Sequence, residues 1–208
     1  DNGDTPIYAG AVYCYNGLEV NGGTLSGKAP GAGISTGDGE GKGGTCVING
    51  GTVIGDAVEK GASYGTSGIS VIGNITINRG SVTAKNGYVG LDATNTLAIN
   101  GGQVVASGSQ VGIHGGAYAK DKEKDNVTIA GGTVHAQGAK YDIYGGDFGD
   151  EPVPTRVYLK GGSIFTGSNK IQPEPISYID EDDDIEVKAE LVTMNGLPAD
   201  SSVSLFFN

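Results

Sequence analysis

The sequence is poor in large core-forming side chains and in positive charge. It has no tryptophan and one methionine among 208 residues, whereas 39 residues are glycine. This composition describes a turn-rich chain without a conventional globular core. Lys and Arg number 13 against 24 Asp and Glu, so the formal net charge is −11. An acidic chain is repelled by nucleic acid and by anionic membranes, and we expect neither as a partner.

Long apolar runs and helical periodicity are also missing. No run approaches the roughly 18 apolar residues that a membrane-spanning helix needs, so we expect no membrane insertion. No window repeats apolar residues at i, i+3, i+4 and i+7 over three turns, which argues against amphipathic helices.

The chain does contain a short motif of alternating aliphatic residues, usually with a glycine doublet, which occurs six times. The copies begin at Leu18, Cys46, Ile75, Leu97, Val127 and Val157. In all six copies a second apolar position follows the first after seven residues. A third follows after nine more in four of the coils, and the next copy begins another six residues on where no insertion intervenes, as from Ile75 to Leu97, which gives a minimal repeat of 22 residues. Self-similarity at a period of about 20–50 residues is typical of solenoids, so each copy predicts one coil of a stack.

Within a coil the apolar residues alternate at period two, which predicts three short strands separated by turns. Successive coils should lie about 4.8 Å apart, so that like residues form columns along the axis. The side chains that we expect to point inward include Val82, Ala84, Val104, Ala106, Val134 and Ala136. The asparagines before the doublets, such as Asn49 and Asn78, tolerate a positive φ and can bond to their own turns.

The phrase Ile-Asn-Gly-Gly-x-Val-x-Ala-x-Gly with a following Gly-Ile resembles the right-handed parallel β-helix repeats of bacterial cell-surface and secreted proteins. The resemblance covers roughly residues 7–177. It implies an all-β, right-handed parallel β-helix solenoid of about six coils of 22–30 residues, in an extracellular or cell-surface setting. We therefore divide the chain into a parallel β-helix over residues 1–177 and a small C-terminal β cap, or the start of a further domain, over residues 178–208.

The two cysteines are interpreted as structural. Cys46 lies at an inward position that is aliphatic in the other coils, where it acts as a small buried hydrophobe. Cys14 follows the inward Val12 by two residues and should also point inward. Because the two cysteines lie in different columns, we expect free, buried thiols, although a disulfide between them stays an alternative. No Cys or His stands at ligand spacing, so no metal or cofactor is expected; Ca²⁺ at the acidic run 180–184 is the alternative.

Coils longer than 22 residues predict protruding loops, where function tends to lie. Three insertions fall at the same corner of the coil, at Thr36–Thr45, Ala117–Asn126 and Asp147–Arg156. A fourth, Asp56–Gly65, falls at a different corner. Variation in loop length costs little, so plain drift is the alternative explanation.

The candidate ligand-binding residues form a ladder on the third strand of the coil. Asp92, His114 and Tyr144 each follow an inward aliphatic residue, so we expect them to face solvent as neighbours on successive coils. Asp142 lies beside them, in a column otherwise made of glycines that would flatten the surface. An aromatic ring can stack on a sugar while carboxylates accept bonds from its hydroxyls. An ordinary solvated sheet face is the alternative.

These observations favour a non-catalytic carbohydrate-binding or adhesion module with a polysaccharide or glycan as its partner. A polysaccharide-degrading enzyme and a passive structural spacer are the alternatives. Pectin-cleaving enzymes share the β-helix architecture, but fold does not carry function with it. A hydrolase needs two carboxyl groups about 5–10 Å apart, and Asp92 and Asp142 leave that possibility open. No catalytic residue is assigned.

Overall fold

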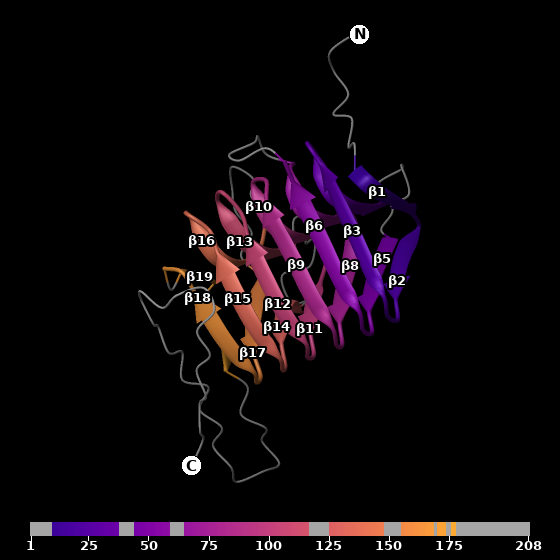
Figure 1. Cartoon of the computed structure of the whole chain (residues 1–208). Coiled ribbons are helices and arrows are strands. Elements are labelled where there is room, and N and C mark those ends of the chain that lie inside the picture. The colour runs from indigo at the N-terminus through magenta and orange to yellow at the C-terminus, as the bar shows by residue number, and fades with distance from the viewer. Residues whose placement is uncertain are drawn as a thin grey trace.

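The computed structural model describes residues 10–37, 44–58, 65–116, 125–147, 155–168, 170–173 and 176–177. The regular secondary structure of these residues is β-strand throughout, in three parallel sheets (Figure 1). The expected all-β class is thereby confirmed. No helix long and apolar enough to cross a membrane occurs in this part of the chain.

Each sheet takes every third strand of the chain. Sheet A has the order β1 (Gly10–Tyr15), β4 (Ala32–Gly37), β7 (Ser67–Val71), β10 (Val89–Ala93), β13 (Val111–Gly115), β16 (Tyr141–Gly145) and β19 (Ile171–Gln172). Sheet B has the order β2 (Gly17–Val20), β5 (Gly44–Ile48), β8 (Gly73–Ile77), β11 (Leu97–Ile99), β14 (Asp125–Ile129), β17 (Arg156–Leu159) and β20 (Ile176–Ser177). Sheet C has the order β3 (Thr24–Ala29), β6 (Thr52–Ala57), β9 (Ser81–Asn86), β12 (Gln103–Ser107), β15 (Thr133–Gln137) and β18 (Ser163–Thr166).

The chain therefore passes through sheets A, B and C in turn, and we call one such circuit a coil. All strand pairs within the sheets are parallel, as a repeated circuit in one sense requires. This arrangement is compatible with a β-helix solenoid. Sheet C, which lies toward the viewer in Figure 1, shows the regular succession of coils from β3 to β18.

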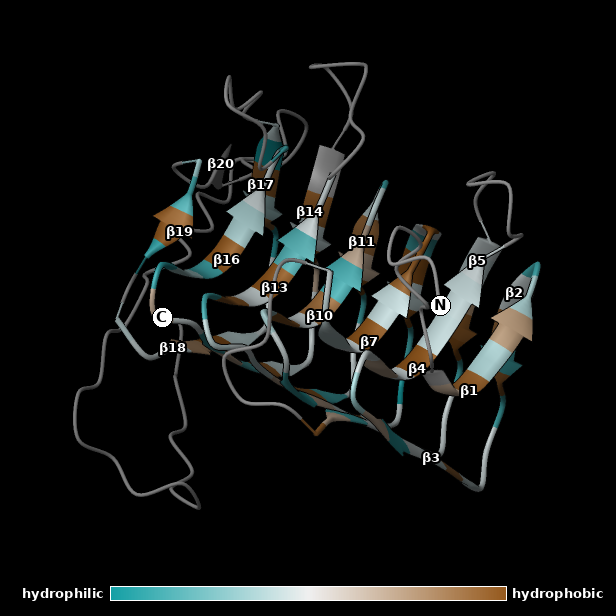
Figure 2. Cartoon of the chain, turned by 90° about the horizontal axis from the view of Figure 1, so that it is seen from above, coloured by the Kyte–Doolittle hydropathy of each residue, from teal (hydrophilic) through white to brown (hydrophobic). Residues whose placement is uncertain are grey.

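The core lies between the three sheets and consists of apolar columns. The register places the first apolar residues of the six copies side by side, in the order Leu18, Cys46, Ile75, Leu97, Val127 and Val157. A second column in sheet C contains Val82, Val104 and Val134, all with an exposed fraction of 0%. Bands of hydrophobic residues accordingly recur from strand to strand (Figure 2). The predicted strand phase is confirmed, because a shift by one residue would turn these valines outward.

The asparagines before the glycine doublets form a hydrogen-bonded row across four coils. Asn49 donates to Asn21 at 2.9 Å, Asn78 to Asn49 at 2.8 Å, and Asn100 to Asn78 at 2.9 Å. These asparagines do not take the positive φ that we expected them to tolerate. That conformation falls to the second glycine of the doublet, as at Gly51 with φ 83°. The asparagine side chains thus link neighbouring coils.

The insertions fall where the spacing predicted. The first three connect sheet A to sheet B, by way of β4 to β5, β13 to β14 and β16 to β17. The fourth connects sheet C to sheet A, by way of β6 to β7. The flanking strands therefore confirm one shared corner and one separate corner. Most of each insertion, and the predicted cap at 178–208, lie outside the described residues.

Both cysteines are free thiols, but they differ in burial. Cys46 is 1% exposed, as expected, whereas Cys14 is only half-buried, so the expectation of full burial is wrong there. Cys14 lies on β1, the first strand of sheet A, which has a neighbouring strand on one side only within the described residues. Burial, and secondarily the nearby Cys14, raises the pKa of the Cys46 thiol to about 12. Cys46 is therefore an unreactive part of the core.

Candidate functional site

Asp92, His114 and Tyr144 are neighbours on successive strands of sheet A, as the spacing predicted. Asp92 pairs with His114 between β10 and β13, and His114 pairs with Tyr144 between β13 and β16. Their exposure differs from the expectation, however. His114 is 1% exposed and Tyr144 is 4% exposed, while the Asp92 side chain retains 18%. The prediction that the whole ladder faces solvent is therefore wrong.

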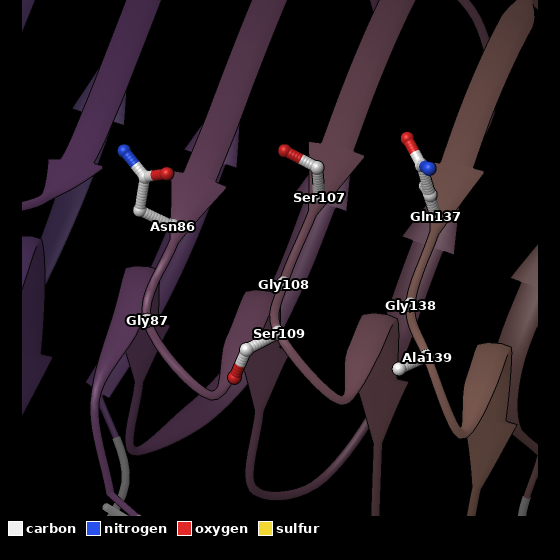
Figure 3. A pocket seen from close by; sticks show the side chains of 8 residues that line it. All are labelled: Asn86, Gly87, Ser107, Gly108, Ser109, Gln137, Gly138 and Ala139. Atoms are coloured by element: carbon white, nitrogen blue, oxygen red, sulfur yellow. The ribbon is translucent and has the colours of Figure 1, made fainter. Parts of the chain in front are cut away.

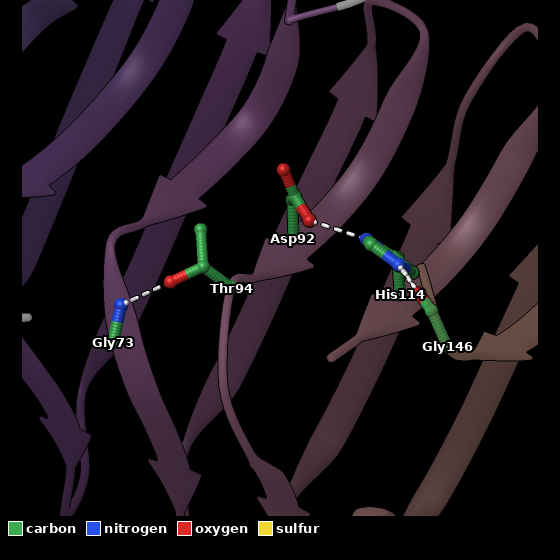
Figure 4. A network of polar contacts seen from close by, with 5 residues as sticks. All are labelled: Gly73, Asp92, Thr94, His114 and Gly146. Atoms are coloured by element: carbon green, nitrogen blue, oxygen red, sulfur yellow. Dashed lines mark hydrogen bonds and ion pairs between the residues drawn. The ribbon is translucent and has the colours of Figure 1, made fainter. Parts of the chain in front are cut away.

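The His114 ring is held by hydrogen bonds at both nitrogens. Nδ1 lies 2.7 Å from Asp92 Oδ1, and Nε2 lies 2.7 Å from the carbonyl oxygen of Gly146 (Figure 4). A carbonyl oxygen can only accept, so Nε2 carries a hydrogen and donates it to Gly146. The ring thus ties β10 to the backbone that follows β16. A comparable bond runs from the Gly73 amide to Thr94 Oγ1 at 2.7 Å.

Tyr144 is packed into a small aromatic and aliphatic cluster outside the main core. Its ring stacks on Tyr141 with centroids 4.7 Å apart and on His114 at 5.6 Å. Val89 and Val111 complete the buried cluster. The Tyr144 hydroxyl donates to the Asp147 carbonyl at 2.9 Å, and burial raises its pKa, with smaller contributions from Tyr141 and Asp147. Because Tyr144 is only 4% exposed, its ring has no free face for stacking on a sugar.

Asp142 fastens the chain where it leaves β18 and enters β19. Its side chain is fully buried, and Oδ1 accepts from the Gly138 amide at 3.1 Å. Oδ2 accepts from the Ser168 amide, the Ser168 hydroxyl and the Lys170 amide, at 2.9 to 3.1 Å. Because both carboxylate oxygens accept hydrogen bonds from the protein itself, the carboxylate has a structural role. Asp142 is therefore not a surface residue beside the ladder, and it offers no second carboxylate to a hydrolase.

The glycines in the same column as Asp142 do not flatten an exposed surface, which corrects a second expectation. A Cβ added to Gly68 would lie 2.3 Å from the Lys85 amide nitrogen, and one added to Gly112 would lie 2.6 Å from that of Gln137. Real Cβ atoms do not approach backbone so closely. The column is glycine because the end of each sheet C strand packs directly against sheet A.

A groove runs along this corner between sheets C and A. Its volume is about 390 Å³, and it crosses three successive coils. Asn86, Ser107 and Gln137 stand in a row at the ends of β9, β12 and β15 and project in one direction (Figure 3). Gly87, Gly108, Ser109, Gly138 and Ala139 complete the lining. The lining carries amide and hydroxyl groups and no charge.

This groove was not predicted, although the sequence carries a local signal for it. The three polar residues of the row each precede a glycine, in the pairs Asn86-Gly87, Ser107-Gly108 and Gln137-Gly138. Recurring polar-glycine pairs at strand ends mark turns with little side-chain volume. The residue types of the ladder are chemically more reactive than the amides, hydroxyls and glycines of the groove, so they give the stronger sequence signal for a site.

An ion-pair network adjoins the groove on the same face of sheet C. Asp56 Oδ2 lies 3.6 Å from Lys28 Nζ and 3.4 Å from Lys85 Nζ, while Asn86 Nδ2 donates to Oδ1 at 2.6 Å. Burial alone would raise the pKa of Asp56, but Asn86 and the two lysines outweigh it and lower the pKa. The register continues this column from Lys85 to Ser107 and Gln137.

No group of three or more His, Cys, Asp or Glu side chains in the described ranges is arranged to hold a metal ion. No family model, curated protein or solved structure matches the chain. The candidate site consequently rests on geometry, and the groove at the corner of sheets C and A is a concave surface of the described residues onto which amide and hydroxyl side chains project.

Proposed function

We propose that this chain is a non-catalytic carbohydrate-binding or adhesion module, secreted or displayed on a bacterial cell surface. The observation that supports it best is the groove, because three successive coils each contribute an amide or hydroxyl side chain at the end of a sheet C strand, namely Asn86, Ser107 and Gln137. Amides and hydroxyls both donate and accept, which matches the hydroxyl groups of a sugar. Neighbouring coils are about 4.8 Å apart, so the row suits an extended chain of sugars lying along the axis.

The proposal includes the finer description of the scaffold as a right-handed parallel β-helix. Parallel strands joined by a crossover are right-handed in about 98% of known cases, and every circuit of this chain joins parallel strands of the same sheet. The surface location follows from the resemblance of the repeats to those of bacterial surface proteins.

The proposed site is the groove and not the ladder of Asp92, His114 and Tyr144. Contact between the ladder and a ligand stays an untested prediction, but the burial of His114 and Tyr144 argues against it. Tyr144→Phe removes only the hydroxyl that bonds to Asp147. We expect this variant to keep its glycan affinity. A folded Tyr144→Phe protein that has lost its affinity would indicate that the ladder, and not the groove, is the binding site.

A glycan array with the purified chain tests the proposal, followed by titration of the glycans that bind. Gln137→Ala is expected to weaken binding by about fivefold to tenfold, because it removes the hydrogen bonds of one groove amide. Gln103→Ala is the matched control, since Gln103 is exposed on β12 but does not line the groove. Equal losses in the two variants would contradict the proposed site. Release of new reducing ends from a glycan would indicate an enzyme, and the absence of binding to every glycan on the array would favour a structural spacer.

A further inference from the structure

In the ion-pair network beside the groove, the two lysine side chains are exposed to solvent and the aspartate is nearly buried. The Lys28 side chain is 66% exposed and that of Lys85 is 44% exposed, whereas the Asp56 side chain that both contact is 11% exposed. Two cations share one anion, and the anion is the buried member. The surface at this point is therefore locally positive, although the chain as a whole carries a net charge of −11.

The network and the groove form one continuous track. Lys28, Asp56, Lys85, Ser107 and Gln137 are register partners on five consecutive strands of sheet C, from β3 to β15. Asn86 belongs to both parts, because it lines the groove and donates to Asp56. A ligand that lies along Gln137 and Ser107 reaches Lys85 at the next coil.

We propose that the groove binds an acidic glycan, with an anionic substituent of the sugar held by Lys85 and Lys28 at the end of the groove toward β3. This inference rests on the proposed function and specifies its ligand class. A carboxylate or a sulfate group supplies the same chemistry, namely oxygen acceptors with negative charge for ammonium donors. The neutral part of the groove then binds sugar hydroxyls, and the lysines determine which glycans are preferred.

Asp56 has a positioning role in this arrangement. Its carboxylate holds both ammonium groups within 4 Å, and Asn86 fixes the carboxylate in turn. The two ammonium groups are thereby held at Asp56, which contacts the groove residue Asn86. A third cation near the groove, Lys140, lies over the Tyr141 ring with Nζ 5.3 Å from its centroid and is a comparison for the test.

The test uses matched pairs of oligosaccharides that differ only in charge. Glucuronate-containing hyaluronan oligosaccharides are compared with their methyl esters, and sulfated carrageenan oligosaccharides with their desulfated forms. The whole chain is expected to bind the acidic member of one pair about tenfold more tightly, the effect of a charge-assisted hydrogen bond. Salt should reduce this preference through screening. The pair that shows the preference identifies carboxylate or sulfate as the group.

Substitution of the lysines locates the effect. The double variant Lys28→Gln with Lys85→Gln is expected to lose the preference for acidic members while retaining affinity for neutral ones. Lys160→Gln, in the turn between β17 and β18, and Lys140→Gln each remove one positive charge and should leave the preference intact. Combined in one protein they match the charge change of the double variant, and the preference should still be retained. Thermal unfolding confirms that each variant is folded.

The outcomes separate the two proposals. Binding of neutral and acidic members with equal affinity would overturn the acidic-glycan inference and leave the groove as a neutral glycan site. A preference lost in Lys140→Gln but kept in the double variant would also overturn it. If no glycan of any kind binds, the proposed function fails together with this inference.

Discussion

Two adjacent valines of β12 show how the burial of a side chain differs between neighbouring residues of one strand. Val104 is 0% exposed inside the stack and Val105 is 43% exposed on the outer face of sheet C. The two residues share a strand, a residue type and nearly the same backbone, and they differ in the face on which they lie. The pair therefore isolates the effect of burial.

Val104→Asp should prevent folding, because it places an unpaired carboxylate among aliphatic columns. The expected loss exceeds about 4 kcal/mol, which is at the extreme of single substitutions. Val105→Asp is the control and should fold with a melting temperature close to that of the parent. Far-ultraviolet circular dichroism with thermal melting distinguishes them. Similar behaviour of the two variants would contradict the strand phase.

The ionisation of Asp56 makes the stability of the fold depend on pH in the acid range. Its pKa lies below the ordinary value of 3.8, mainly because Asn86 and two lysines favour the charged form against the effect of burial. A depressed folded-state pKa stabilises the protein above the ordinary value, and this stabilisation is lost as the pH falls through the folded-state pKa.

Asp56→Asn should therefore flatten the acid side of the stability profile. Urea unfolding at about pH 6 and about pH 3 brackets the ordinary carboxyl range. The parent chain should lose more unfolding free energy between these two values than the variant does. An equal loss in both proteins would show that Asp56 contributes nothing to acid stability.

The inward residues were predictable from sequence, whereas the exposure of the ladder was not. Alternation within a strand is local, so inward Val104 and Ile113 follow from their own neighbours in the chain. The burial of His114 depends on Asp92, Tyr144 and Gly146, which approach from other strands and from the segment after β16. Alternation gives the face on which a side chain lies, but it does not give what packs over that face.

Between strands, the glycine column sets how closely sheet C can approach sheet A. A Cβ at Gly112 would meet the Gln137 amide nitrogen and the Asp142 carbonyl oxygen, both at 2.6 Å. The neighbouring atoms are backbone, which cannot yield as the end of a long side chain can. The spacing of glycines in the sequence indicated a column, but it did not show whether that column faced solvent or another strand.

Gly112→Ala should destabilise the protein by about 1–3 kcal/mol through overpacking. Gly22→Ala is the matched control, because a Cβ there meets nothing within 4 Å. Chemical denaturation of both variants measures the difference. A Gly112→Ala protein as stable as the Gly22→Ala protein would mean that sheets C and A are less closely packed than described.

For the whole molecule, the 22-residue coil is the unit that keeps the columns in register. Residues 75–96 make up one such coil, and their removal joins Asn74 to Leu97. Asn74 would then take the place of Thr96, and Cys46 would become the neighbour of Leu97 in the sheet B column. Each remaining inward residue would still face inward.

A chain without residues 75–96 should fold into the same kind of stack with one coil fewer. Its melting temperature should be lower, since the apolar area buried between coils decreases. Removal of residues 75–85, about half a coil, is the control and should abolish cooperative unfolding because it misaligns all three sheets. Folding of both deletions, or of neither, would contradict the coil as the structural unit.

The groove is assembled from one polar side chain per coil, and this has a consequence for how its length can change. In most binding proteins a longer ligand requires a reshaped pocket, with many compensating substitutions. Here the duplication of a single repeat adds one more position to the row and leaves the others where they were, while the loss of a repeat removes one. Under the proposed function, copy number therefore sets how many ligand units the groove contacts, and gene duplication alone can alter it.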